Sequence, residues 1–191
     1  MKKILLVVLC LQFAVGLFAD SALEGSVVTN NNVDPIIKKD HEISINVFGV
    51  FIGSYTAQFE FVPSGDGLFT LGAKGTVNDI KIDSDTLSGF QALAVARLYP
   101  ARYMRGFYIM AEGGYASSSA EDENGVSTNL TSVPLLAGLG WKWVINEFSI
   151  DAGLAYGKQI YLTNPDQGVV DINSFPFNIA FDSYLLVGYR F

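Results

Sequence analysis

The sequence predicts an all-β protein: an eight-stranded antiparallel up-and-down transmembrane β-barrel. Three observations lead to this fold class. Eight segments after position 41 alternate between apolar and polar residues, which is the pattern of strands. Charged residues make up only 16% of the chain, against about 25% in typical soluble proteins. The chain also ends on an alternating strand, YLLVGYRF, where most domains end in a polar tail.

The first 19 residues have the plan of a secretory signal peptide. Lys2 and Lys3 precede an apolar stretch that ends in the small residue Ala19. An N-terminal transmembrane anchor is the alternative, but the apolar stretch is short and a polar segment follows at once. Cleavage after Ala19 would remove Cys10, so we expect a mature chain without cysteine and without disulfides.

Residues 20–40 have no clear period and include an Asn run and Pro35. We expect them to form an N-terminal periplasmic segment that precedes a barrel of residues 41–191. Loss of Lys2 and Lys3 leaves 10 of the 12 basic residues against 19 acidic ones, a net charge of −9. An acidic chain without a basic cluster is not expected to bind nucleic acid.

Eight strands are predicted, and no helical pattern follows the signal peptide. Their ranges are Glu42–Ile52, Tyr55–Val62, Leu68–Val77, Leu87–Tyr99, Phe107–Ala116, Thr131–Ile145, Phe148–Tyr161 and Phe175–Phe191. The second, fourth and sixth connections are short, the third, fifth and seventh are longer, and the first, at Gly53 and Ser54, is an exception because it is tight. Outer-membrane barrels have short periplasmic turns and longer outer loops. Both termini are therefore expected on the periplasmic side, and the acidic connection Ser117–Asn129 at the cell surface.

Each predicted strand has one large apolar face and one face of small, polar or charged residues. In the seventh strand, Phe148, Ile150 and Leu154 alternate with Ser149, Asp151 and Gly153. Small residues suit the narrow interior of an eight-stranded barrel, so we expect the apolar face to contact lipid. A water-soluble periplasmic lipid carrier of lipocalin shape would need the two faces reversed.

The aromatic residues gather near the strand ends, as expected for two membrane interfaces. The predicted periplasmic belt comprises Phe59, Phe61, Phe69, Phe107, Trp141, Trp143, Phe148, Tyr189 and Phe191. The predicted outer belt comprises Phe51, Tyr55, Phe90, Tyr115, Tyr156 and Phe177.

The final strand has apolar residues at alternate positions before a terminal aromatic: Leu185, Val187, Tyr189 and Phe191. This pattern resembles the C-terminal signal of bacterial outer-membrane barrels, which the barrel-assembly machinery reads. Two short motifs, Phe59–Glu60 and Arg97–Leu98–Tyr99–Pro100, end the second and fourth predicted strands. With them, the chain resembles the small outer-membrane barrels of the OmpA and OmpX kind, and within these a family of uncharacterised barrels. The resemblance covers His41–Phe191 and implies fold and location, but no activity.

Seven charged residues are predicted to point into the barrel as a lumen charge network: Glu60, Lys74, Arg97, Glu112, Lys142, Asp151 and Asp182. Buried charges need partners. Arg97 and Glu112 lie on adjacent predicted strands and are expected to approach each other, and Asp151 and Asp182 are expected to form salt bridges beside Lys142. A structural plug is favoured over a gate or an ion path.

Enzymatic function is not expected. His41 is the only histidine and precedes the first strand, and no G-x-S-x-G motif occurs. The acidic run Glu121–Asn124 lacks the spacing of a calcium loop, so no metal or other cofactor is predicted. We expect a non-enzymatic integral outer-membrane barrel with a closed polar lumen and a structural or surface-interaction role, for which the sequence names no extracellular partner. A small barrel that transports ions or a small apolar solute is the alternative.

Overall fold

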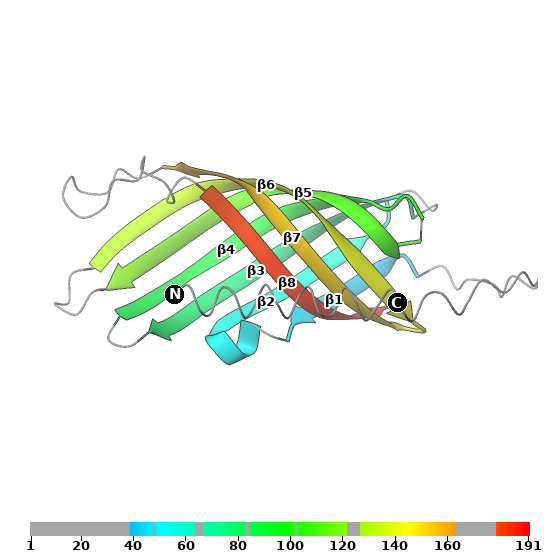
Figure 1. Cartoon of the computed structure of the whole chain (residues 1–191), viewed down its shortest axis with the longest axis horizontal. Helices are drawn as coiled ribbons and strands as arrows, with labels where there is room; N and C mark the ends of the chain where they lie inside the picture. Colours follow the sequence, from blue (N-terminus) through cyan, green and yellow to red (C-terminus); the bar gives the residue numbers. More distant parts are fainter. Residues whose placement is uncertain are drawn as a thin grey trace, which may run out of the picture. The chain divides into compact units, whose positions relative to one another are not determined.

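The computed structural model describes residues 39–47, 49–63, 67–82, 85–101, 103–121, 127–162 and 179–191. These residues form eight strands and one short 3-10 turn, η1 (Figure 1). The strands are β1 (His41–Asn46), β2 (Ser54–Phe61), β3 (Phe69–Ile82), β4 (Asp85–Leu98), β5 (Gly106–Glu121), β6 (Ser127–Ile145), β7 (Phe148–Tyr161) and β8 (Ile179–Arg190), and η1 is Gly49–Ile52. Within this part of the chain, no helix has the length and apolar character needed to cross a membrane.

Every strand pairs antiparallel with its neighbours in sequence, and β1 pairs with β8 to close the barrel. At the seam, Ile43 lies opposite Tyr189, and backbone hydrogen bonds join His41 and Phe191 in both directions, at 3.2 and 3.0 Å. The prediction of an all-β, eight-stranded, up-and-down antiparallel barrel is therefore confirmed. We call the end of the barrel that holds His41 and Phe191 the terminal end, and the opposite end the far end.

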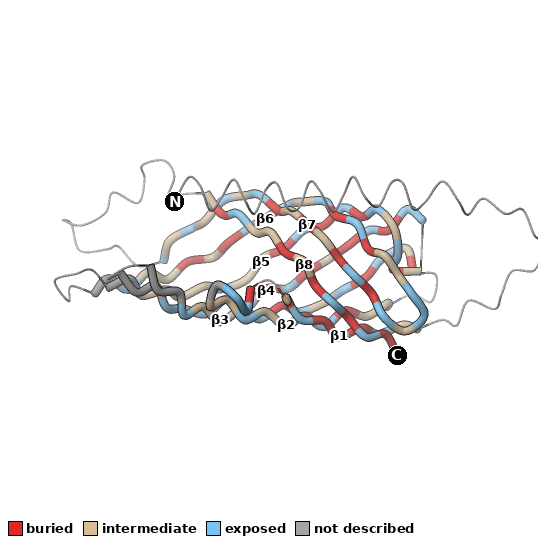
Figure 2. The backbone as a smooth tube through the Cα atoms, turned by 60° about the horizontal axis from the view of Figure 1, so that its bottom comes forward, coloured by how far each residue is buried: buried red, intermediate tan, exposed pale blue. Residues whose placement is uncertain are grey.

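Burial alternates along the strands, as Figure 2 shows in red and pale blue. The pattern is strict in β1, where Glu42, Ser44 and Asn46 are buried and the residues between them are exposed. A residue period of two places successive side chains on opposite faces of the sheet. Most large apolar side chains lie on the outside, and the buried charged side chains lie inside together with a few apolar ones such as Leu93, Leu136 and Leu186. The faces are therefore not reversed as a soluble lipid carrier would need.

The exposed aromatic side chains lie near both ends of the barrel. Those toward the terminal end are Phe59, Phe69, Phe107, Trp141, Phe148, Tyr189 and Phe191, and those toward the far end are Phe51, Tyr55, Phe90, Tyr115, Tyr156 and Phe181. Phe61 and Trp143 are half-buried, and Phe177 lies outside the described residues. The outer surface of the barrel is thus apolar between two rings of aromatic side chains.

The first predicted strand is wrong in its second half. β1 ends at Asn46, and Gly49–Ile52 forms η1. The Asn46 side chain accepts a hydrogen bond from the Gly49 backbone N–H at 3.2 Å, which holds the chain in the turn. A Cβ on Gly49 would lie 2.2 Å from the Ser54 carbonyl oxygen, so the turn needs glycine at that position.

Two predicted long loops are also wrong. The β3–β4 ladder continues to the pair Ile82 and Asp85, and the β5–β6 ladder to the pair Glu121 and Ser127. Polar residues fill these outer parts of the strands, and polarity alone does not stop a ladder whose backbone groups remain paired. The predicted loop Ser117–Asn129 is therefore mostly strand.

Several predictions fall outside the described residues. The signal peptide, nearly all of the N-terminal segment and residues 122–124 of the predicted acidic run are among them. The same holds for residues 163–178, which include most of the predicted seventh loop and the predicted start of the last strand. These remain predictions.

Candidate functional site in the barrel interior

Arg97 lies at the centre of an ionic cluster in the half of the interior nearest the terminal end. Its Nη1 donates to Glu60 Oε2 at 2.9 Å and to Asp151 Oδ2 at 2.7 Å. Lys142 Nζ donates to Glu60 Oε2 at 2.6 Å and to Glu42 Oε1 at 3.0 Å. These side chains come from β1, β2, β4, β6 and β7, so the cluster ties together five strands across the interior.

Arg190 completes this group, because its Nε lies 3.9 Å from Glu42 Oε2. We call Glu42, Glu60, Arg97, Lys142, Asp151 and Arg190 the inner cluster. It contains three carboxylates and three cations, so its formal charges cancel. Buried ions are tolerated when they are paired, and every carboxylate of the cluster has a cation partner. The hydrogen bonding is not complete, because Glu42 Oε2, Arg97 Nε and Arg190 Nε have no hydrogen-bond partner among the described residues.

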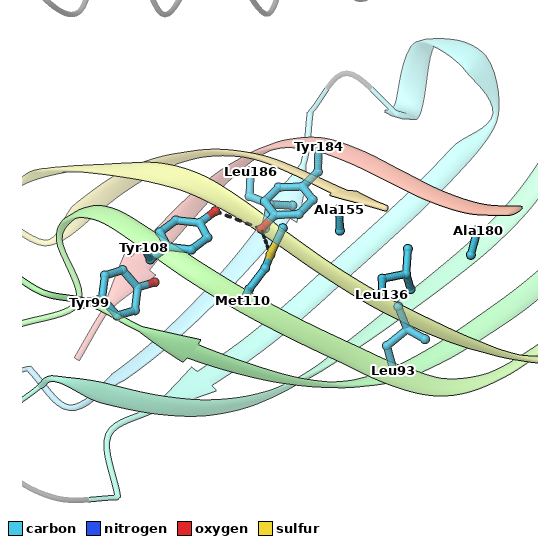
Figure 3. Close-up of a cluster of buried hydrophobic side chains, with 9 residues drawn as sticks. All are labelled: Leu93, Tyr99, Tyr108, Met110, Leu136, Ala155, Ala180, Tyr184 and Leu186. Atoms are coloured by element: carbon cyan, nitrogen blue, oxygen red, sulfur yellow. Dashed lines mark hydrogen bonds between the residues drawn. The ribbon is translucent and has the colours of Figure 1, made fainter. Parts of the chain in front are cut away.

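Three tyrosines supply further hydrogen bonds to the inner cluster. Tyr99 donates to Glu60 Oε1 at 2.9 Å, and Tyr108 donates to Asp151 Oδ1 at 2.5 Å. Arg97 Nη2 donates to the Tyr184 hydroxyl at 2.8 Å, and its guanidinium carbon lies 4.6 Å from the centre of the Tyr108 ring. The hydroxyls of Tyr108 and Tyr184 lie 2.9 Å apart and form a hydrogen bond, drawn as a dashed line in Figure 3. The tyrosines therefore fill the space between the charges and use the lone pairs that ion pairing leaves.

Two glycines make room for these rings. Gly140 on β6 and Gly153 on β7 lie directly opposite each other. An added Cβ on Gly140 would lie 2.2 Å from the Tyr108 hydroxyl, and one on Gly153 would lie 2.5 Å from Tyr184 Cζ. The small inward residues in the sequence thus reflect the space that the large polar side chains occupy.

A second ionic group lies toward the far end, and we call Lys74, Glu112 and Asp182 the outer cluster. Lys74 Nζ donates to Glu112 Oε1 at 2.6 Å and also to Asp182 Oδ2. The Lys74 ammonium lies 5.0 Å from the centre of the Tyr184 ring, so Tyr184 separates the two clusters. Two carboxylates share one ammonium here, and the outer cluster carries one formal negative charge in excess.

The connection between β4 and β5 closes the terminal end. Met104 is fully buried, and Tyr103 and Met104 both have left-handed backbone angles, with φ of 60° and 53°. Non-glycine residues seldom adopt this conformation. Arg190 Nη2 donates to the Tyr103 carbonyl at 3.1 Å, and the Met104 backbone N–H donates to the Gly67 carbonyl at 3.4 Å. These contacts hold Met104 under the inner cluster.

All seven residues of the predicted lumen network lie on the inward face, although in two groups. The expected pair of Arg97 and Glu112 is wrong, because Arg97 binds Glu60 and Asp151 whereas Glu112 binds Lys74. Asp182 binds Lys74 as well. Of the two aspartates, only Asp151 approaches Lys142, with 3.8 Å between its Oδ2 and the lysine Nζ. Neighbouring strand positions do not decide these pairs, since long side chains reach across the narrow interior to other strands.

Sequence reasoning missed two members of the inner cluster. Glu42 and Arg190 alternate with outward residues such as Ile43 and Tyr189, so the period of two could have found them. No sequence pattern predicted that the three tyrosines meet, because alternation places Tyr184 on the inward face but does not indicate which residues it contacts.

The four residues of the predicted assembly signal lie on β8 or directly after it. Val187, Tyr189 and Phe191 are exposed on the outer surface, and Leu185 is half-buried. His41 is stacked on the Phe191 ring at 5.7 Å between ring centres, so the single histidine lies outside the barrel and away from the carboxylates.

No group of three or more His, Cys, Asp or Glu residues able to hold a metal ion occurs in the described ranges. Comparison with protein-family models, curated proteins and solved structures found no match for this chain.

Proposed function

We propose that the chain is a non-enzymatic integral barrel of the bacterial outer membrane, of the OmpA and OmpX kind. In this proposal a cleaved signal peptide directs the chain across the inner membrane, and the barrel-assembly machinery inserts it. The barrel has a closed lumen and acts as a structural or surface-interacting protein through its outer connections. Outer-membrane lipid is its main contact.

One observation carries the membrane part of this proposal: the barrel has its apolar side outward. Within the described residues, 27 large hydrophobic side chains are exposed, whereas Arg97, Lys142, Asp151 and Glu60 are at most 1% exposed. A soluble monomer rarely exposes contiguous apolar surface beyond a few hundred Å². In lipid the same surface is buried, and the β1–β8 ladder closes the barrel from the terminal end up to the pair Asn46 and Leu186, so no strand edge is left unpaired there.

Heat-modifiable gel migration tests membrane insertion. The mature protein folded in detergent is expected to migrate differently from the boiled sample, because a closed barrel resists unfolding by the gel detergent. When the inner and outer membranes of cells are separated, the folded form should be found in the outer-membrane fraction. A mature protein that stays soluble and monomeric without detergent would contradict the proposal.

The closed lumen is supported by the two ionic clusters and by Met104 below them. Eight strands leave an interior just wide enough for side chains. We therefore expect planar-bilayer recordings of the wild-type protein to show no large, steady conductance. A known porin recorded under the same conditions is the positive control. A large, steady conductance from the wild-type protein would favour the transport barrel and refute the plug.

The orientation is supported by the position of both ends of the barrel sequence at the terminal end, together with the long strands at the far end. We expect an epitope inserted after Gly125, between β5 and β6, to be labelled by antibody on intact cells. An epitope inserted between Asn146 and Glu147, at the terminal end, is the matched control and should be labelled only after permeabilisation. The reverse result would invert the topology.

A further inference from the structure

The barrel wall is incomplete at the far end, between β8 and β3. β1 and β2 have 6 and 8 residues, whereas β3 to β7 have 14 to 19. The β1–β8 ladder ends at the pair Asn46 and Leu186. Among the described residues, Ile179–Leu185 therefore pairs with β7 alone. Figure 1 shows the short β1–β2 hairpin, with η1 at its tip, beside the longer β8. We call this step in the wall the notch.

The rim of the notch is apolar. The β1–β2 connection, residues 47–53, reads VFGVFIG and has no polar side chain. Phe51 is 85% exposed, and Val50 on the turn and Phe181 on β8 are about half exposed. Turns in water favour Gly, Pro, Asn, Asp and Ser. An exposed apolar turn suits contact with hydrocarbon, a point that rests on the proposed membrane insertion.

The outer cluster lies behind this notch. Lys74 and Asp182 belong to β3 and β8, the two strands that flank it, and their ion pair joins those strands. The Asp182 side chain is 23% exposed, so the cluster is reachable. Unlike the inner cluster, the outer cluster has one carboxylate more than it has cations.

Glu112 is the member of the outer cluster that is incompletely bound. Its side chain is fully buried, and its Oε2 has no hydrogen-bond partner in the described part of the chain. Glu42 Oε2 in the inner cluster also lacks a hydrogen bond, but the Arg190 cation lies 3.9 Å from it. Leaving a buried charged oxygen without a donor carries a large desolvation penalty. A second ammonium group would supply both the missing hydrogen bond and the missing positive charge.

We propose that the notch binds a cationic amphiphile: a protonated primary amine carrying an alkyl chain. Its ammonium donates to Glu112 Oε2 and to Asp182, and its alkyl chain lies along Val50, Phe51 and Phe181 at the rim. The described residues hold no cluster of three metal-ligating side chains, so the chemistry favours an ammonium ion over a divalent metal. Hydrogen bonds to charged groups are among the strong ones, which gives the head group its specificity.

Thermal unfolding of the folded protein in zwitterionic detergent tests the proposal, because a ligand that binds only the native state raises its unfolding temperature. The measured quantity is the temperature at which the folded gel band converts to the unfolded band. Decylammonium is expected to raise this temperature at a concentration at least tenfold lower than the concentration of methylammonium that has the same effect. Decanoate, with the same chain length and the opposite charge, should not raise it. Asp182→Asn and Glu112→Gln should both lose the decylammonium response, whereas Asp79→Asn, an exposed acid on β3 outside the cluster, should keep it.

An equal response in the wild type and in Asp182→Asn would overturn the proposal, as would equal effects of decylammonium and decanoate or of decylammonium and methylammonium. If Glu112→Gln folds poorly, Asp182→Asn still tests the proposal, because the Asp182 side chain is partly exposed. These results do not depend on membrane insertion. In vesicles, Phe51→Cys should resist a water-soluble maleimide that labels Asn129→Cys, an exposed position in the polar far-end part of β6. Equal labelling would place the rim in water and reject the alkyl site. Failure of membrane insertion itself would instead appear as a mature protein that is soluble without detergent.

Discussion

Arg97→Met is expected to lower the free energy of unfolding more than any other single substitution in the interior. Arg97 binds Glu60 and Asp151 at 2.9 and 2.7 Å and donates to the Tyr184 hydroxyl at 2.8 Å. Removing one partner of a buried ion pair typically costs about 3–5 kcal/mol, because the remaining charge stays buried without compensation. The expected result is a large fall in the temperature at which the folded band converts in detergent.

Two further variants separate charge from packing in this prediction. Arg97→Met with Asp151→Asn restores the charge balance of the inner cluster and should recover part of the loss. Arg97→Met with Glu112→Gln should recover less, because Glu112 binds Lys74. Lys158→Met, which removes an exposed basic residue on β7, is the matched control and should have little effect. Equal recovery by the Asp151 and Glu112 double variants would contradict the ion pairs described above.

The period-two pattern predicted which side chains point inward but not which ones meet. Alternation along a strand fixes the face of Arg97 and of Glu112, since successive side chains point to opposite sides of the sheet. It says nothing about reach across the interior, where Arg97 on β4 meets Asp151 on β7, 54 positions away. Pairing therefore depends on the register of strands that are distant in sequence and on the barrel closing.

Strand ends were the least predictable feature, for two different physical reasons. Residues 47–52 are apolar and read as a continuation of β1, but Gly49 and the Asn46 side chain turn the chain there. Ser117–Glu121 reads as a polar loop, but pairing with β6 continues the strand because each backbone group retains a partner. In both places the hydrogen bonds of the backbone, and not the hydrophobic pattern, determine where the strand stops.

The last strand is expected to be indispensable for assembly. Changing both Tyr189 and Phe191 to Ser should leave the chain unfolded or degraded in the periplasm, with little folded protein in the outer membrane. These side chains lie at the seam: Phe191 stacks on His41 at 5.7 Å between ring centres, and Tyr189 lies opposite Ile43 of β1. Tyr189 also packs against Phe148 of β7 at 5.7 Å between ring centres. Burying one large apolar side chain contributes about 1.5–3 kcal/mol, so the double change also weakens the finished barrel.

Phe107→Ser with Trp141→Ser is the control that isolates the terminal strand. Phe107 and Trp141 form a cross-strand pair at the same end of the barrel and are exposed to a similar extent, but they lie on β5 and β6, away from the seam. This variant loses comparable apolar surface and should still reach the outer membrane in folded form. Equal loss in both variants would show that total aromatic surface matters and that the C-terminal position does not.

Loss confined to the variant at Tyr189 and Phe191 would instead assign these residues to recognition or to closure of the seam. Refolding of the purified variant in detergent separates these two roles. A variant that folds in detergent yet fails to assemble in cells has lost recognition, because the seam can still close.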